Sequence, residues 1–349
     1  MSAFADSCRL RPAAELCSRT VESGVRVMHL VDDDGVGGIS TVVDSFMHSC
    51  LADTCKQQVI RMHQGRCLFP SYQADVIVLH YASSWGRLAV LLLLRLLNPR
   101  ARLPLHEHHY TAAVDRRVSH RVRFHRMLRL TYRLVDTVVA VSRAQGEWMR
   151  SLRLVKWNRL RVIPPCRDLG KFLKVPPPVP GKQLVLGAYG RLHRQKGFDL
   201  LLQAMRRLPP GNFRLLVGGA GPEEAALKEL AESMPHVEFV GGVTNVPAFL
   251  ECCDVVVVPS RYEPYGLVCL EAKAAGRPVI VADIDGLPEQ VNDCGLVVPP
   301  GNVEALAGAL RSLCDQPLYL WGRNGRALTL ALWDNYQTTW EELLNPVNP

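Results

Sequence analysis

The chain has 349 residues, and 48% of them are hydrophobic, a globular composition that excludes an intrinsically disordered chain. Its net charge of +8 is concentrated in residues 1–170, where 25 Lys and Arg stand against 14 Asp and Glu, so we expect this half to prefer an anionic partner. The longest apolar run, LAVLLLLRLLNP, is about ten residues long, about half of what spans a bilayer, and the N-terminus has no signal-peptide pattern.

The first half of the chain alternates between the patterns of buried strands and of helices. We expect strands at 25–31, 75–80, 102–106, 137–142 and 159–164. Helices are expected between them at 39–51, 84–97, 116–134 and 144–152. Such alternation favours a parallel sheet with helices on both faces.

A proline-rich stretch, LKVPPPVPGK at 173–182, fits neither a strand nor a helix and predicts a semi-rigid linker. A second alternating set follows it. Its expected strands lie at 184–190, 213–219, 237–242, 254–260, 278–283 and 295–300, and its expected helices at 198–208, 222–234, 246–253 and 266–276. The last 35 or so residues have an amphipathic helical pattern, in which we expect four residues to anchor the packing: Trp321, Trp333, Tyr336 and Trp340.

The predicted fold is therefore α/β, with two Rossmann-like, doubly wound domains that face each other across a cleft. We assign residues 1–172 to the first domain, 183–317 to the second, and 318–349 to C-terminal helices. Ligands of open α/β sheets lie beyond the carboxyl ends of the strands, and the polar motifs of this chain follow predicted strands.

Two cations follow the strand at 184–190, in the segment GRLHRQKGF. Arg191 and Lys196 lie in the turn before the helix that opens near Phe198. Together with a helix N-terminus they could neutralise a diphosphate without a metal ion. The alternative is a solvated surface turn, where arginine and lysine are common.

Two carboxylates lie eight positions apart in PSRYEPYGLVCLEAKAAGRPVI. Glu263 follows a strand and Glu271 lies within the next helix, so the two could hold the ends of a sugar nucleotide. In the alternative, Glu263 caps the helix and Glu271 pairs with Lys273 or Arg277. A third element is Gly286, which ends a loop before Pro288 and would let the backbone approach an anion.

The first half supplies weaker candidates. Gly37 and Gly38 would let the backbone approach a ligand from the opposite wall, and Asp32 with Asp34 forms a DxD that we do not expect to bind metal. His106, in PLHEHHY, ends a strand and is expected to face the cleft, where it could position a hydroxyl; a hydrogen-bonded structural histidine is the alternative.

No metal site is expected elsewhere either. The neighbouring residues His108 and His109 stand too close to His106 in sequence for the three rings to converge easily, and His80 is a weaker candidate of the same kind as His106. The eleven cysteines include no CxxC pair, which predicts reduced thiols and a cytoplasmic protein.

The expected helix at 116–134 is basic, and apolar residues are interleaved with its arginines: Arg116, Arg117, Arg121, Arg123, Arg126 and Arg129. Residues 116–133 therefore favour contact with an anionic membrane or an anionic acceptor, with a merely solvated basic face as the alternative. Nucleic acid is not an expected partner, because no recognition motif accompanies the charge.

Taken together, GRLHRQKGF, LVGGAGPE, VEFVGGV, DVVVVPSRYEPYGLVCLEAKAAGRPVI and GLPEQV resemble the donor domain of glycosyltransferase family 4, in order and spacing. VIPPCRDLGKF resembles the end of that family's N-terminal domain, and the first half matches only through GVGG, VIVLH, PLH and VAVS. The resemblance implies the GT-B fold, with the last helix packed on the first domain. It also implies retaining, metal-independent transfer from a nucleotide-diphosphate sugar without a cofactor.

The resemblance also implies roles for particular residues. Arg191 and Lys196 would bind the diphosphate, Glu263 the donor sugar, and Glu271 the ribose. His106 would lie near the sugar's 6-position. The donor would also contact the backbone or side chains of Gly37, Gly38, Gly266, Leu267 and Gly286. Ile39 departs from the polar residue that many relatives have at this point.

The acceptor would be a glycan or glycolipid, as in surface polysaccharide or lipopolysaccharide biosynthesis, and the enzyme would be cytoplasmic or peripheral on the membrane's inner face. Two alternatives stay open: a nucleotide-sugar epimerase of the same architecture, and a non-catalytic protein that binds nucleotide sugars. The sequence identifies neither the base and sugar of the donor nor the linkage.

Overall fold

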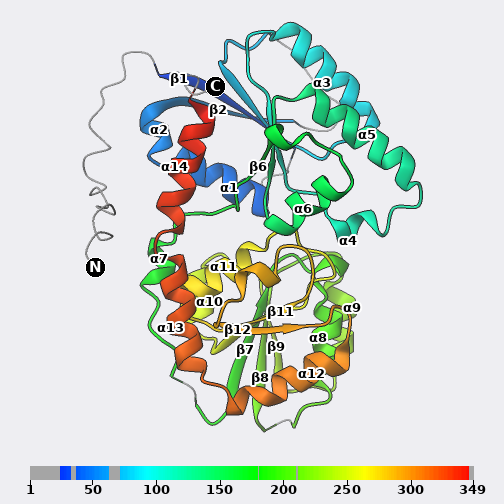
Figure 1. The fold of residues 1–349 in the computed structure, drawn as a ribbon. Helices are drawn as coiled ribbons and strands as arrows, with labels where there is room; N and C mark the ends of the chain where they lie inside the picture. The colour runs from blue at the N-terminus through cyan, green and yellow to red at the C-terminus, as the bar shows by residue number, and fades with distance from the viewer. Residues whose placement is uncertain (1–23, 33–36, 63–70, 180, 210, 346–349) are drawn as a thin grey trace, which may run out of the picture.

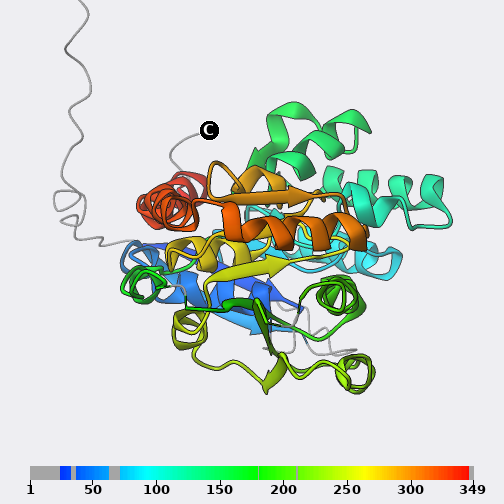
Figure 2. The same ribbon diagram turned by 90° about the horizontal axis from the view of Figure 1, so that it is seen from below.

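The computed structural model describes residues 24–345 except 33–36, 63–70, 180 and 210. The described chain forms two six-stranded parallel sheets, each covered by helices, and the two lobes lie one above the other in Figure 1. Figure 2 shows the same layers from below. The two predicted parallel sheets are confirmed.

The first sheet has the strand order β2-β1-β3-β4-β5-β6, and every neighbouring pair is parallel. Its strands are β1 (Val25–Val31), β2 (Cys55–Arg61), β3 (Val76–His80), β4 (Pro104–Glu107), β5 (Thr137–Ala140) and β6 (Leu160–Val162). The central strand β3 is buried along its whole length, as its unbroken apolar sequence predicts.

The helices of this domain are α1 (Gly38–Met47), α2 (Leu51–Thr54), α3 (Trp85–Leu97), α4 (Ala112–Asp115), α5 (Arg121–Leu134), α6 (Arg143–Ser151) and α7 (Gly170–Leu173). The prediction of one basic helix over 116–134 is wrong, because a turn separates α4 from α5. Arg116 and Arg117 therefore lie outside the basic helix.

The second sheet has the order β12-β11-β10-β7-β8-β9, again with parallel neighbours. Its strands are β7 (Leu184–Tyr189), β8 (Phe213–Gly218), β9 (Val237–Gly241), β10 (Val255–Val258), β11 (Val279–Ala282) and β12 (Gly295–Val298). The helices are α8 (Phe198–Met205), α9 (Glu224–Ala231), α10 (Val246–Glu251), α11 (Leu267–Ala274) and α12 (Val303–Ser312).

Besides the four-residue helices α2, α4 and α7, one strand and one longer helix escaped the sequence analysis. Strand β2, with the sequence CKQQVIR, lies at the sheet edge and is only partly buried, so polar residues interrupt the apolar pattern that marks a strand. Helix α12 begins at Val303, before the C-terminal region that we assigned to helices, and Asn302 caps it by accepting a hydrogen bond from the Ala305 amide at 2.9 Å.

The last helices, α13 (Leu318–Thr329) and α14 (Leu332–Leu344), run from the second domain back to the first (Figure 1). Trp340 of α14 is fully buried and its ring meets that of Phe46 edge-on at 4.8 Å. Gln337 accepts a hydrogen bond from the Cys50 amide at 3.0 Å. One hydrophobic cluster includes Phe46, Trp340 and Leu270 of α11, so the two domains share part of a core. The domain and linker limits given above stay predictions.

Candidate active site

Two helix N-termini, one from each domain, meet where the sheets face each other. A methyl group built on Gly38, at the start of α1, would lie 3.8 Å from Leu267 Cδ1, at the start of α11. Gly266, the residue before α11, has a φ of 93°, a conformation that glycine adopts readily and other residues rarely do. Gly38 therefore lies close to the N-terminus of α11, the helix that carries Glu271, while its predicted contact with the donor stays a prediction.

Lys196 and Glu263 form an ion pair on the second-domain side of this contact. Lys196 Nζ lies 2.5 Å from Glu263 Oε2, which also accepts a hydrogen bond from Ser260 Oγ at 3.2 Å. Lys196 ends the 3-10 helix η3 (Arg194–Lys196) after β7, whereas Glu263 follows β10, and these strands are neighbours in the sheet. The alternative that Glu263 caps the helix is wrong, because α11 has no side-chain cap.

Arg191 has a different environment from Lys196. It follows Gly190, whose φ of 137° turns the chain at the end of β7, and its side chain is exposed. Among the described residues Arg191 makes no ion pair, so its guanidinium keeps its full charge for an incoming anion. A diphosphate at this turn would therefore meet one unpaired cation and one cation whose charge a carboxylate shares.

Glu271 is buried and doubly hydrogen-bonded. Its Oε1 accepts from Arg167 Nη1 at 2.6 Å and its Oε2 from the Tyr189 hydroxyl at 2.7 Å. Burial raises the pKa of the Glu271 carboxyl, and the Arg167 charge opposes that rise. The alternative pairing with Lys273 or Arg277 is wrong, because both of those side chains donate to backbone carbonyls instead.

The loop after β11 connects the two domains in a way that sequence analysis missed. Asp285 accepts hydrogen bonds from Thr111 Oγ1 at 2.9 Å and from the Ala113 amide at 3.1 Å in the first domain. It also accepts one from the Glu263 amide at 3.1 Å, and burial raises the pKa of its carboxyl. Asp285 thus ties the segment before α11 to the first domain.

Gly286 lies in the same loop, but its amide is not free for an anion. The Gly286 N–H donates to the Glu263 carbonyl oxygen at 3.2 Å. A Cβ at this position would lie 2.3 Å from the Pro264 carbonyl oxygen, so the backbone approach that requires glycine is to the protein itself. The predicted contact between this amide and a donor phosphate therefore has no support in the arrangement described.

The prediction that His106 faces an open cleft is wrong. Its side chain is fully buried, and its ring centroid lies 5.0 Å from that of Trp340 and 3.9 Å from that of His108. It is not a hydrogen-bonded structural histidine either, because neither ring nitrogen has a partner within the described part of the chain. Instead, His106 and His108 cluster with His80 of the neighbouring strand β3.

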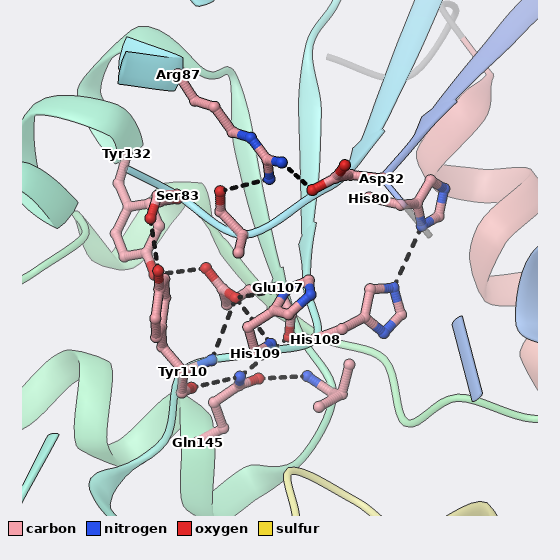
Figure 3. A network of polar contacts seen from close by, with 12 residues as sticks. Asp32, His80, Ser83, Arg87, Glu107, His108, His109, Tyr110, Tyr132 and Gln145 are labelled. Carbon is pink, nitrogen blue, oxygen red and sulfur yellow. Dashed lines mark hydrogen bonds and ion pairs between the residues drawn. The ribbon is translucent and has the colours of Figure 1, made fainter. Parts of the chain in front are cut away.

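A buried glutamate fixes the turn that carries this cluster (Figure 3). Glu107 accepts hydrogen bonds from the His109 amide at 3.0 Å, the Tyr110 amide at 3.3 Å and the Tyr132 hydroxyl at 3.0 Å. The two amide contacts hold the backbone that follows His108, whose Nε2 lies 3.2 Å from His80 Nδ1. Residue type and spacing gave no signal for this network, because its members come from separate elements.

Of the two aspartates of the DxD motif, only the first lies among the described residues. Asp32 forms an ion pair with Arg87 of α3, which gives this carboxylate a structural partner (Figure 3). Asp34 lies outside the described residues, so the expectation for the pair stays a prediction.

Helices α3 and α5 pack together and expose an unusual mixture of residues. Arg123 of α5 lies over the ring of Trp85 of α3 at 5.7 Å. Leu92, Leu93 and Leu96 of α3 are 48%, 40% and 67% exposed. Basic and apolar side chains thus share one exposed region. None of the helices in the described ranges is long and apolar enough to cross a membrane.

Not all the arginines of α5 are free for an external partner. Arg121 pairs with Asp115 at 2.7 Å, and Arg129 donates to the Leu152 carbonyl at 2.9 Å. Arg123, Arg126 and Arg133 have exposed side chains. These three carry the positive charge that α5 presents to solvent.

Comparison with known proteins agrees with this architecture. Residues 36–171 match the family model Glycosyltransferase Family 4, and residues 183–316 match the model Glycosyl transferases group 1. A structure of HepE from Anabaena in complex with UDP and glucose superposes with a TM-score of 0.76 at 18% identity, over 93% of this chain and 100% of that chain. The fold is therefore GT-B, as predicted.

Curated relatives match part of the chain. An uncharacterized glycosyltransferase of Methanocaldococcus jannaschii is 35% identical over 165 residues, which cover 44% of this chain and 41% of that protein. The lipopolysaccharide core biosynthesis glycosyltransferase LpsD of Rhizobium meliloti is 32% identical over 179 residues, 49% of each chain. The chain thus spans less than half the length of these two relatives. The two family models together cover more than half of the chain, which belongs to glycosyltransferase family 4.

Proposed function

We propose that the chain is a retaining, metal-independent glycosyltransferase that moves a sugar from a nucleotide-diphosphate sugar to a glycan or glycolipid acceptor. The observation that carries the proposal is the ion pair between Lys196 and Glu263, next to the N-terminus of α11 that lies close to Gly38 of the other domain. The same helix carries Glu271. The family membership supports the same reaction class.

The two cations, Arg191 and Lys196, would stabilise the leaving group. As the sugar–phosphate bond breaks, negative charge grows on the diphosphate, and Arg191 and Lys196 would stabilise it from fixed positions. The leaving phosphate oxygen would take the proton of the acceptor hydroxyl on the face from which it departs, so the sugar keeps its configuration. Charge neutralisation therefore needs no metal ion beneath the diphosphate.

The two carboxylates would orient the donor through hydrogen bonds with its hydroxyls. Glu263 would accept hydrogen bonds from sugar hydroxyls, and its ion pair with Lys196 holds the carboxylate in a fixed orientation. Glu271 would accept from the ribose hydroxyls through the lone pairs that its bonds to Arg167 and Tyr189 leave unused. Orienting groups of this kind lower the barrier by holding the reacting atoms in place.

The acceptor that we propose is anchored in an anionic membrane, as for a glycolipid of surface polysaccharide or lipopolysaccharide biosynthesis. The exposed leucines of α3 beside Arg123, Arg126 and Arg133 of α5 match an interfacial surface, in which apolar residues enter the lipid boundary and cations meet headgroups. The relative LpsD acts in lipopolysaccharide core biosynthesis, which is consistent with this assignment. The protein would then work at the inner face of the cytoplasmic membrane.

Neutralising the exposed arginines of α5 is expected to weaken membrane binding. In the triple variant Arg123→Gln, Arg126→Gln and Arg133→Gln, each lost charge removes about 1 kcal/mol of attraction to an anionic surface. Co-sedimentation with phosphatidylglycerol vesicles should fall at least about 10-fold, while hydrolysis of the donor is unchanged. The control variant Arg206→Gln, Arg214→Gln and Arg323→Gln removes three exposed charges from the other half and should bind as the wild type does. Equal vesicle binding by both variants would show that α5 is not the membrane surface.

The reaction itself is tested with a panel of nucleotide sugars, offered with and without candidate glycan acceptors, while free nucleotide is followed. We expect release of nucleotide that depends on the acceptor, together with a product of increased mass. Interconversion of the sugar without net release would identify an epimerase instead. Tight binding without turnover of any donor would identify a nucleotide-sugar-binding protein.

A further inference from the structure

We propose that His80, His106 and His108 bind a zinc ion in the first domain. One ring nitrogen from each of the three histidines can be chosen so that all three lie within 4.8 Å of one another. Zinc holds imidazole nitrogens at about 2.0–2.1 Å in a tetrahedral arrangement, which places neighbouring nitrogens about 3.4 Å apart. The 3.2 Å between His80 Nδ1 and His108 Nε2 is already close to that spacing.

His106 supplies the observation that points to a ligand. Its side chain is fully buried, and both of its ring nitrogens are without hydrogen-bond partners among the described residues. Burying a polar group without a partner costs free energy, and native structures avoid it with few exceptions. A metal ion bound to one nitrogen of His106 would remove that cost. Imidazole nitrogens are ligands that zinc favours.

The hydrogen bonds of His80 have more than one consistent arrangement. His29 Nδ1 lies 3.0 Å from His80 Nε2, and His80 Nδ1 lies 3.2 Å from His108 Nε2. If a proton lies on His80 Nδ1, His80 donates to His108 and no metal is bound. If the proton lies on His80 Nε2, it is donated to His29 Nδ1, and His80 Nδ1 can accept a hydrogen bond from a protonated His108 Nε2. When His108 carries its proton on Nδ1 instead, His80 Nδ1 and His108 Nε2 both offer a lone pair, and a metal ion can bind to the two nitrogens.

The surroundings favour the metal-bound arrangement in two ways. His29 then orients His80 through the nitrogen that does not bind the metal, a contact that is usual behind histidine ligands. His108 is only half-buried, which leaves a path by which an ion and a water ligand can enter.

The position of the cluster indicates a structural role. His80 ends β3 and His106 lies in β4, the next strand of the sheet, while Glu107 fixes the turn that presents His108 (Figure 3). A zinc ion would join these two strands beneath Trp340 of α14. The cations assigned to the diphosphate belong to the other sheet, so the inference does not depend on the proposed transfer reaction.

The test is metal analysis of the full chain, prepared without a polyhistidine tag, stripped with chelator and dialysed against a small excess of zinc. We expect one zinc per chain to be retained. The variants His80→Gln and His108→Gln should bind it at least about 100-fold more weakly. The matched control is His109→Gln, which removes a histidine from the same turn but outside the cluster and should bind zinc as the wild type does. Zinc at about 100 times its dissociation constant should also raise the unfolding midpoint of the wild type by about 4 °C.

Two results would overturn the inference: no retained zinc in the wild type, or equal zinc binding by wild type, His80→Gln and His108→Gln. X-ray absorption of the zinc-loaded wild type gives a readout that does not depend on the folding of any variant. Scattering from three imidazole rings supports the site. Scattering from sulfur would instead place the metal on cysteine thiolates and contradict it.

Discussion

Replacing Lys196 by alanine is expected to lower sugar transfer at least about 100-fold, with the donor that the panel identifies. The variant removes one of two fixed positive charges from the leaving diphosphate, and losing one such preorganised contact typically costs about this much. It also leaves Glu263, whose side chain is only 9% exposed, without its cation. Glu263 then meets the sugar with an uncompensated charge. Steady-state kinetics with saturating acceptor gives the measurement.

Arg194→Ala is the matched control for this result. Arg194 begins the same 3-10 helix, but its side chain is exposed, and it contacts Arg261 through its backbone carbonyl, which accepts a hydrogen bond from Arg261 Nη1. Transfer by this variant should stay within about twofold of the wild type. Near-normal transfer by Lys196→Ala would remove this lysine from the diphosphate site.

Replacing Trp340 by alanine is expected to cause the largest loss of stability, about 3–5 kcal/mol. Its side chain is fully buried between Phe46 of the first domain, His106 and Tyr336 of its own helix. Alanine would leave a cavity in the hydrophobic cluster that the two domains share. Urea unfolding followed by circular dichroism measures the change in the free energy of unfolding.

The comparison variant is Trp157→Ala. Trp157 is 70% exposed and its main contact is the guanidinium of Arg150 at 3.8 Å from the ring centroid. An exposed contact of this kind contributes about 1 kcal/mol or less. If Trp340→Ala lost no more stability than Trp157→Ala, α14 would not be the element that stabilises the contact between the domains.

Strand and helix patterns predicted most of the fold because both sheets are parallel and buried on two faces. Apolar runs such as those of β3 and β10 have no polar interruption. Edge strand β2 lacks that pattern, because solvent reaches part of it. The turn between α4 and α5 was missed because arginine is common in helices and in exposed turns alike, so basic residues alone do not mark the break.

The sequence predicted the individual motifs of the candidate site but not the contacts between them. Lys196 and Glu263 each follow a predicted strand, but their ion pair depends on β7 and β10 being neighbours, which local sequence does not encode. The same limit applies to Asp285, which contacts Thr111 of the other domain.

The histidine cluster shows the limit most clearly. Sequence spacing grouped His106 with His108 and His109, whereas the structure replaces His109 by His80 from the neighbouring strand. Side chains at the carboxyl ends of adjacent parallel strands lie close together whatever their separation in sequence. The pairing of β3 with β4 therefore determines which histidines form the cluster. Arg167 likewise reaches Glu271 from 104 residues away.

Binding of nucleoside diphosphates tests the central claim without any knowledge of the acceptor. Isothermal titration calorimetry would compare the wild type, Lys196→Ala and Arg194→Ala, using the diphosphates of adenosine, guanosine, uridine and thymidine. We expect at least one to bind the wild type and Arg194→Ala equally, and Lys196→Ala at least about 10-fold more weakly. Equal affinity for all three proteins, or no binding of any of them to the wild type, would contradict a diphosphate site at Lys196.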